Sequence, residues 1–202
     1  MRLSKTAYHA DFVIYAVLVG ALCVGAAWLN TSWIQRVHWL EAFAAAAACW
    51  TLLEYLLHGF VLHRIPVFAA MHAVHHDSPR AYVGTPTWVT LGIIWLAVFV
   101  PAWRAISLNV ASGMTAGVML GFLWYGIVHH VIHYRRPRFL AGWMLAGRHW
   151  HLRHHYSNQA GNFGVTTPLW DYVFGTVIRE DRAAARASLG DPTLARLPER
   201  LL

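Results

Sequence analysis

The sequence predicts an all-α integral membrane protein with four transmembrane helices in two hairpins and a helical cap at one end. The 202-residue chain is 57% hydrophobic and only 12% charged, which is unlike a soluble domain of this size. It contains four long apolar runs, each long enough to cross a membrane. Histidine motifs at helical spacings lie beside these runs. Together these features favour a helical bundle in a membrane over a soluble fold.

The first apolar run, residues 12–29, is uncharged and about as long as a hydrocarbon core of ~30 Å requires. A cleaved signal peptide is the alternative interpretation. We favour an anchored helix, because the later spans need it to keep both ends of the chain on one side, and because Cys23 is in a poor context for lipoprotein cleavage. Residues 1–37 are therefore predicted to hold the first transmembrane helix and a short polar turn at residues 30–36.

The second run, residues 38–62, is apolar apart from two glutamates and one further histidine near its end. It is predicted to cross the membrane and project beyond it, carrying His58 and His63 to one surface. These two residues stand at i+5, roughly 140° apart around an α-helix. Either they reach two different ions, or the helix contains a local bulge.

Two further runs, residues 87–103 and 105–133, are predicted to form the second hairpin, joined by a tight connection around Arg104. The last of these runs, like the second, ends in a pair of histidines, His129 and His133. Both hairpins therefore deliver histidines to the same side of the membrane.

The segments between and after the spans are more polar. Residues 64–86 are predicted to contain a short helix that ends before Pro79. Residues 139–145, FLAGWML, suggest an amphipathic segment at the membrane surface. Residues 38–178 are predicted to form the histidine-containing core with the three further transmembrane helices. Residues 179–202 are predicted to form a cytoplasmic tail that carries no catalytic or binding residues.

Charge predicts the orientation. Of the 16 Lys and Arg residues, only Arg36 and Arg104 fall on the side of the two short turns. Because basic residues are retained on the inside, the histidine side and both termini are predicted to be cytoplasmic. The same bias explains much of the net charge of +7, and no basic stripe interleaved with aromatic residues supports nucleic-acid binding.

The histidines form four motifs. HAVHH at residues 72–76 and HLRHH at residues 151–155 place imidazoles at i, i+3 and i+4, toward one face of a helix. HGFVLH and HHVIH each supply a pair. Ten imidazoles are too many for one ion, so we predict a site for two metal ions in the cytoplasmic helical cap. The predicted ligands are His58, His63, His72, His75, His76, His129, His133, His151, His154 and His155.

Glu54 is a candidate to support this site from behind. It lies one turn before His58, and a ligating histidine usually donates its other ring N–H to a carboxylate or a carbonyl. The alternative is a carboxylate at the membrane boundary without partners. The four histidines outside the motifs are interpreted as ordinary core or surface residues: His9, His38, His130 and His149.

Three alternative roles for the histidines fit the sequence less well. A loose metal-scavenging tract or a purification tag would not keep fixed spacings within apolar helical patterns. A structural zinc site is typically rich in cysteine, whereas Cys23 and Cys49 lie far from every motif. A transporter should place ionisable residues near the middle of several spans, and here they gather at one end.

Imidazole suits iron, zinc and copper. A redox metal pair at a membrane surface suggests oxygen activation, and the spans offer an apolar route by which an acyl chain or polyisoprenoid reaches the metals away from water.

The motifs HGFVLH, HAVHH, HHVIH and HLRHH, followed by GVTTPLWDYVFGT, resemble the integral-membrane fatty acid hydroxylase and sterol desaturase superfamily. Within it, the pattern is most similar to the fatty acid 2-hydroxylases, over roughly residues 54–176. The resemblance implies a dimetal oxygenase, usually described as di-iron, that uses O2 and two electrons to hydroxylate a C–H bond of a membrane lipid. Zinc can occupy such sites in purified material. No separate side-chain acid or base is assigned.

Two departures bear on the details. The link from His63 to His72 is shorter than expected for the eukaryotic 2-hydroxylases and is similar to the compact first half of bacterial carotenoid hydroxylases. A carotenoid or sterol hydroxylase or desaturase is therefore the alternative, beside a non-catalytic metal-binding membrane protein. Because no heme-binding module is visible, we expect a separate electron donor: a cytochrome, a ferredoxin or a reductase. The alanine- and arginine-rich composition favours a bacterial inner membrane over an endoplasmic reticulum membrane.

Overall fold

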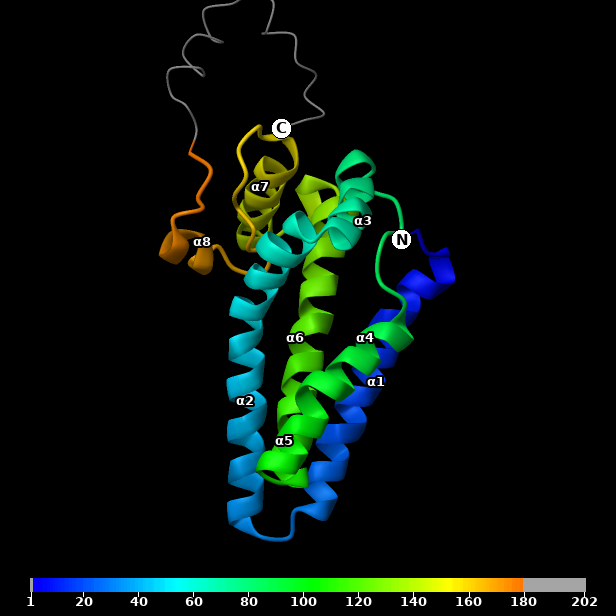
Figure 1. Ribbon diagram of the computed structural model, residues 1–202, viewed down its shortest axis with the longest axis vertical. Helices are drawn as coiled ribbons and strands as arrows, with labels where there is room; N and C mark the ends of the chain where they lie inside the picture. The colour runs from blue at the N-terminus through cyan, green and yellow to red at the C-terminus, as the bar shows by residue number, and fades with distance from the viewer. Residues whose placement is uncertain (1, 180–202) are drawn as a thin grey trace, which may run out of the picture.

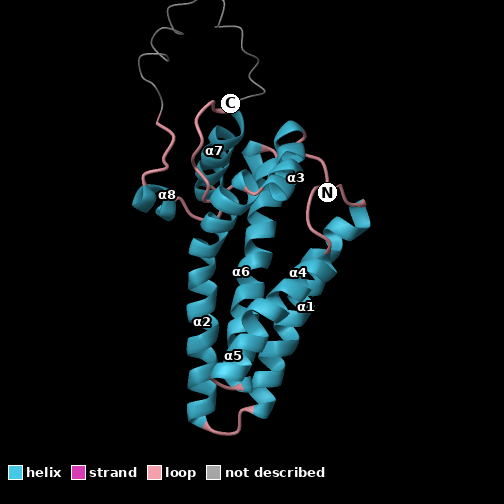
Figure 2. Ribbon diagram, in the orientation of Figure 1, coloured by secondary structure: helices cyan, strands magenta, loops and turns pink. Residues whose placement is uncertain are grey.

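The computed structural model describes residues 2–179, which are mostly helical and contain no β-strand (Figure 2). Long helices run side by side and shorter ones cover one end of the bundle (Figure 1). The prediction of an all-α fold is confirmed. The long elements are α1 (Lys5–Leu29), α2 (Trp33–Leu56) with its π-helical continuation η1 (Leu57–Leu62), α4 (Thr87–Ile94), π-helical η2 (Trp95–Phe99), α5 (Val100–Ala105) and α6 (Leu108–Tyr134).

Among the described residues, four helical stretches are long and apolar enough to cross a membrane: Lys5–Leu29, Trp33–Leu62, Thr87–Ala105 and Leu108–Tyr134. The four predicted spans are confirmed. Their outer surfaces are apolar and uncovered; on α1, Val13, Val17 and Val24 are 63%, 63% and 60% exposed. Such a surface is suited to lipid rather than water.

The helix ends differ from the apolar runs. α1 begins at Lys5 rather than residue 12, because the Ser4 side chain caps it by accepting a hydrogen bond from Ala7 N at 3.1 Å. α2 begins at Trp33, inside the turn predicted at residues 30–36, because Ser32 and Gln35 form a capping box. Hydropathy marks membrane depth, whereas local hydrogen bonds set where a helix begins.

α6 is the central helix of the bundle. It packs along both α2 and α1, which contact each other only slightly (Figure 1). The chain connections form two hairpins as predicted, but the helices of the first hairpin pack mainly on α6 rather than on each other. Glycines allow the close approach to α2: a Cβ at Gly117 would overlap the carbonyl oxygen of Phe43, and one at Gly121 would overlap the Trp50 ring.

Polar contacts join α1 to α4 within the apolar bundle. Tyr15 Oη donates to Thr90 Oγ1 at 2.6 Å, and Thr87 Oγ1 donates to the Asp11 carboxylate. Tyr15 is fully buried. These four side chains thus find partners inside the bundle, as an apolar environment favours.

Short elements form the cap at the end where η1 and α6 finish (Figure 1). The N-terminal residues lie at the same end, where Leu3 N donates to Tyr82 O at 2.7 Å. The segment predicted as amphipathic, residues 139–145, spans the end of a 3-10 turn and the start of a helix, with Phe139 and Trp143 67% and 58% exposed. The tail predicted at residues 179–202 lies outside the described residues, apart from Arg179. The cap elements are α3 (Pro66–Asp77), η3 (Pro137–Phe139), α7 (Gly142–Tyr156) and α8 (Leu169–Phe174).

Candidate metal centre

The ten predicted histidines gather in two groups of five, each able to hold a metal ion. Within each group, the candidate ligand nitrogens all lie within 4.8 Å of one another. His9, His38, His130 and His149 belong to neither group. The first cluster consists of His58, His63, His72, His76 and His154, and the second cluster consists of His75, His129, His133, His151 and His155.

A π-helical turn brings His58 and His63 together. η1 covers Leu57–Leu62, and its i→i+5 hydrogen-bond pattern turns a residue onto the same side of the helix as the one five positions earlier. Both side chains therefore reach the first cluster. The local bulge is confirmed, and the pair lies in one cluster rather than being divided between the two.

The two H-x-x-H-H motifs exchange one histidine each. α3 gives His72 and His76 to the first cluster but His75 to the second. α7 does the reverse, giving His154 to the first cluster. Each triplet thus presents all three imidazoles to the metal centre but divides them between the two clusters, a division that the sequence left open. Residues at i and i+4 lie about 40° apart, whereas i+3 lies about 60° away on the other side, toward the neighbouring cluster.

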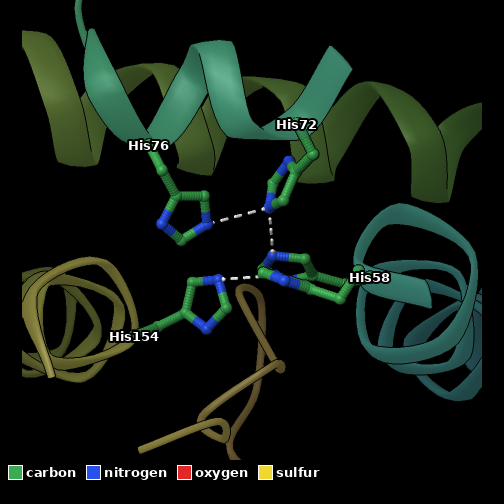
Figure 3. A group of neighbouring side chains, drawn as sticks. His58, His72, His76 and His154 are labelled. Atoms are coloured by element: carbon green, nitrogen blue, oxygen red, sulfur yellow. Dashed lines mark hydrogen bonds between the residues drawn. The ribbon is translucent and has the colours of Figure 1, made fainter. Parts of the chain in front are cut away.

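Each cluster is consequently built on the same plan. The end of a membrane helix supplies one pair of histidines to each cluster: the η1 region to the first cluster and α6 to the second. One cap helix adds an i, i+4 pair, and the other cap helix adds a single residue. Figure 3 shows this convergence for His58, His72, His76 and His154.

The spacing of the ring nitrogens fits a metal ion. In the first cluster, His72 Nε2 lies 3.1 Å from both His58 Nε2 and His76 Nε2 (Figure 3). In the second cluster, His151 Nε2 lies 3.0 Å from His133 Nε2. Metal–nitrogen bonds of about 2.1 Å place neighbouring ligands at right angles about 3.0 Å apart.

Hydrogen bonds indicate which nitrogen of two rings carries the proton. His58 Nδ1 lies 2.6 Å from Phe163 O, and His154 Nδ1 lies 2.8 Å from Gly161 O. A carbonyl only accepts, so each Nδ1 must be the donor, and each Nε2 presents a lone pair to the cluster. Converging lone pairs repel one another unless a cation lies between them, so the donor set fits a metal ion.

Burial keeps these imidazoles neutral. Desolvation is the main cause that lowers the pKa of His63 and His75 to about 4 and the pKa of His154 to about 3. Charge on neighbouring histidines acts in the same direction. Neutral imidazole is the form that binds metals, so the cap presents its histidines ready for coordination at neutral pH.

Glu54 was a candidate acceptor for the His58 ring, but it does not hydrogen-bond to His58. It is buried, and Oε1 accepts from the backbone N–H groups of Val165 and Thr166, both at 2.7 Å. Oε2 accepts from Thr166 Oγ1 at 2.7 Å. The acceptor for His58 is instead the carbonyl of Phe163, two residues before the segment that Glu54 holds. The alternative of a carboxylate without partners is wrong as well.

The sequence marked residues 164–176 only through the family resemblance, and no role was predicted for residues 161–166, which supply both carbonyl acceptors. Nor was a role predicted for Asp171, which is fully buried and accepts hydrogen bonds from this segment. The only signal for these groups was the phrase GNFGVTTPLWD, in which glycines and a lone acid come after the last histidine motif.

Two hollows adjoin the first cluster and share His63 and His76. One has a volume of about 300 Å³ and extends along Leu62, Ala69 and Ala73. The other, of about 390 Å³, has a more polar lining. Its lining includes Arg64, Ser157, Asn158, Gln159 and Phe163.

A four-span bundle whose cap collects ten histidines into two groups defines the class of integral-membrane histidine-box proteins. Residues 43–176 match the family model described as fatty acid hydroxylase, and the chain belongs to this family. The resemblance drawn from the motifs is therefore confirmed.

Named relatives and one solved structure agree. A fatty acid 2-hydroxylase from Rattus norvegicus is 30% identical over 152 residues, which cover 69% of this chain and 40% of the relative. A ceramide very long chain fatty acid hydroxylase, SCS7 from Saccharomyces cerevisiae, is 33% identical over 150 residues, covering 69% and 38%. The chain thus spans about 40% of the length of these relatives. The structure of full-length scs7p, in which only the hydroxylase domain is visible, is similar with a TM-score of 0.72 at 26% identity, covering 88% of this chain and 69% of that one.

Proposed function

We propose that this protein is a membrane-bound, O2-dependent hydroxylase of the non-heme di-iron type that acts on a fatty acid or fatty-acyl lipid, with carbon 2 as the favoured position. The observation that carries the proposal is the pair of five-histidine clusters at one end of an apolar bundle. Family membership and the names of the relatives support the reaction and the lipid class.

In this proposal the ten histidines hold two metal ions, five to each ion. Iron is the expected working metal, and zinc can replace it in purified material. Bound iron would supply the redox chemistry that lets O2 oxidise a C–H bond, because imidazole ligands suit iron and iron is redox-active. The protein's own contribution is to hold neutral ring nitrogens at fixed spacing and to keep the surroundings poor in water.

The hollows beside the first cluster support an approach of the substrate from that side. One hollow has an apolar side, formed by Leu62, Ala69 and Ala73, which suits an acyl chain that arrives from the lipid phase; its remaining lining is His63, His72, His76 and Asp77. The other carries Arg64, Asn158 and Gln159, whose polar groups suit the head of the lipid. Glu54 belongs to this proposal as an indirect support of the first cluster, acting through the backbone of residues 165 and 166.

The setting of the enzyme is inferred from the same features. We place both termini and the metal centre in the cytoplasm, because the basic residues gather on that side. The alanine- and arginine-rich composition is the reason for preferring a bacterial inner membrane. A separate cytochrome, ferredoxin or reductase would deliver the two electrons. A carotenoid or sterol substrate remains the alternative, and the fatty-acyl names of the relatives favour the first choice.

The test is a lipid extract of cells that express the protein, compared by mass spectrometry with cells that express His154→Ala. We expect an oxygen atom to be gained by fatty acids or their amides only with the unaltered protein. Gain on carotenoids or sterols would move the substrate to the alternative. No difference, with metal bound and a reductase supplied, would favour a non-catalytic metal-binding protein.

A further inference from the structure

Residues 161–166 form a loop that contacts the first cluster through its backbone, and we call this segment the carbonyl loop. Gly161 O accepts from His154 and Phe163 O accepts from His58. The two histidines lie far apart in the sequence, on α7 and η1. One short loop therefore fixes the tautomer and the ring orientation of both.

Asp171 on α8 holds the carbonyl loop from below. It is fully buried, and its carboxylate accepts from Phe163 N at 2.8 Å and from Gly164 N at 2.9 Å. It also accepts from Thr176 Oγ1 at 2.7 Å and from Trp150 Nε1 at 3.2 Å. A carboxylate only accepts, so four donors match it, whereas an amide in its place would turn an N–H group toward donors.

Close contacts and further hydrogen bonds also confine the backbone of the carbonyl loop. A Cβ at Gly164 would overlap Thr167 O, so the chain passes too close for any other residue. Asn162 has a φ of 53°, and its side chain accepts from Ile178 N at 2.8 Å and donates to Trp150 O at 3.2 Å. The loop is a tightly specified structure, and hydrogen bonds to a charged group are the strongest of those that specify it.

Two rings of the second cluster lack this kind of support. Within residues 2–179, the buried Nδ1 atoms of His151 and His155 have no hydrogen-bond partner. The carbonyl loop contacts His58 and His154, both of the first cluster. The two clusters share one plan for their histidines, but they differ in the groups that lie behind the rings.

We propose that Asp171 is a positioning residue for the first metal site alone. By holding the carbonyl loop, it keeps the Nδ1–H tautomer and the orientation of His58 and His154, and so sets the affinity of the first cluster for its ion. This proposal rests on the metal-binding role in the proposed function. Loss of such an outer partner typically weakens metal binding about 10- to 100-fold.

The experiment measures each site by itself. In full-length protein purified in detergent, His129→Ala with His133→Ala leaves only the first cluster complete, and His63→Ala with His72→Ala leaves only the second. Zn²⁺ affinity is measured in both backgrounds by competition with a chromophoric chelator, before and after Asp171→Asn. We expect a loss of about 10- to 100-fold in the first background and a change of less than about twofold in the second.

Controls separate positioning from general instability. Trp170, the residue before Asp171 on α8, donates a hydrogen bond from Nε1 to Thr51 Oγ1. Thr51→Val removes this bond without changing a contact of the carbonyl loop, and should leave the Zn²⁺ affinity of both backgrounds unchanged. Glu54→Gln, at the other end of the loop, should reproduce the selective loss if Asp171→Asn does not fold. The visible spectrum of bound Co²⁺ should shift with Asp171→Asn in the first background only.

Equal loss in both backgrounds, or no loss in either, would overturn the positioning role. If neither background binds Zn²⁺ before Asp171 is changed, the metal-binding assignment itself has failed. That result is distinct from binding that Asp171→Asn leaves unaffected.

Discussion

The π-helical turn at the end of the second span offers a sharp test of the first cluster. Deleting Val61 would leave His58 and His63 four positions apart, and a regular α-helix places such residues about 40° apart, on one face. A π turn is in effect one extra residue in an α-helix, so its removal lets the helix become regular without turning the residues after it. We expect the variant to keep both metal ions.

The matched change is deletion of Val131, which lies between His129 and His133 in the regular helix α6. Here no extra residue is present to absorb the loss, so everything beyond the deletion turns by about 100° and shifts by about 1.5 Å. A ring about 5 to 6 Å from the helix axis then moves about 8 to 9 Å. That exceeds the 4.8 Å within which the ligand nitrogens gather, so we expect the second ion to be lost.

Both deletion variants would be purified in detergent and their metal content per chain measured by atomic emission spectrometry. Two ions without Val61, and one or none without Val131, would support the geometry. The reasoning is refuted if the Val61 deletion loses its ion as completely as the Val131 deletion does.

Three further outcomes are expected. Gly117→Ala should lower the stability of the bundle by about 1 to 3 kcal/mol, because the new Cβ would overlap Phe43 O. Gly25→Ala should not lower it, because a Cβ there meets nothing within 4 Å, and equal melting temperatures of the two variants would contradict this packing. Tyr15→Phe should cost about 1 kcal/mol through the lost bond to Thr90 while metal content stays constant; a loss of metal would mean that the α1–α4 contact reaches the site. Chelation should abolish lipid oxidation, Fe²⁺ should restore it and Zn²⁺ should restore only thermal stability; oxidation with Zn²⁺ alone would rule out iron as the working metal.

The spans could be predicted because a membrane imposes a simple requirement, about 20 apolar residues for each crossing. The histidine groups could be predicted because helical spacing projects directly onto a surface, as with His129 and His133. The division of each triplet between two clusters could not, since it depends on how α3 and α7 lie relative to each other. The helix ends at Lys5 and Trp33 depended on capping side chains that hydropathy does not register.

The supports behind the rings were the least visible in the sequence. A backbone carbonyl such as Phe163 O belongs to every residue type, so no letter in the sequence marks it as an acceptor for His58. Glu54 was singled out for its charge and its spacing, and its carboxylate does support the same region, but through the backbone of Val165 and Thr166. A lone buried acid such as Asp171 is informative only once four donors are seen around it.

The exchange of histidines between the triplets explains why the motifs occur in pairs. If α3 served one cluster and α7 the other, each ion would fix one cap helix to one membrane helix, and the two halves of the cap could move independently. Because His75 and His154 cross over, each cluster contacts both cap helices together with η1 or α6. An ion at either cluster would therefore orient both α3 and α7, and the geometry that the other cluster needs would be formed at the same time. A chain of this size can thus hold two sites on two short helices, since each site serves as part of the scaffold for its neighbour.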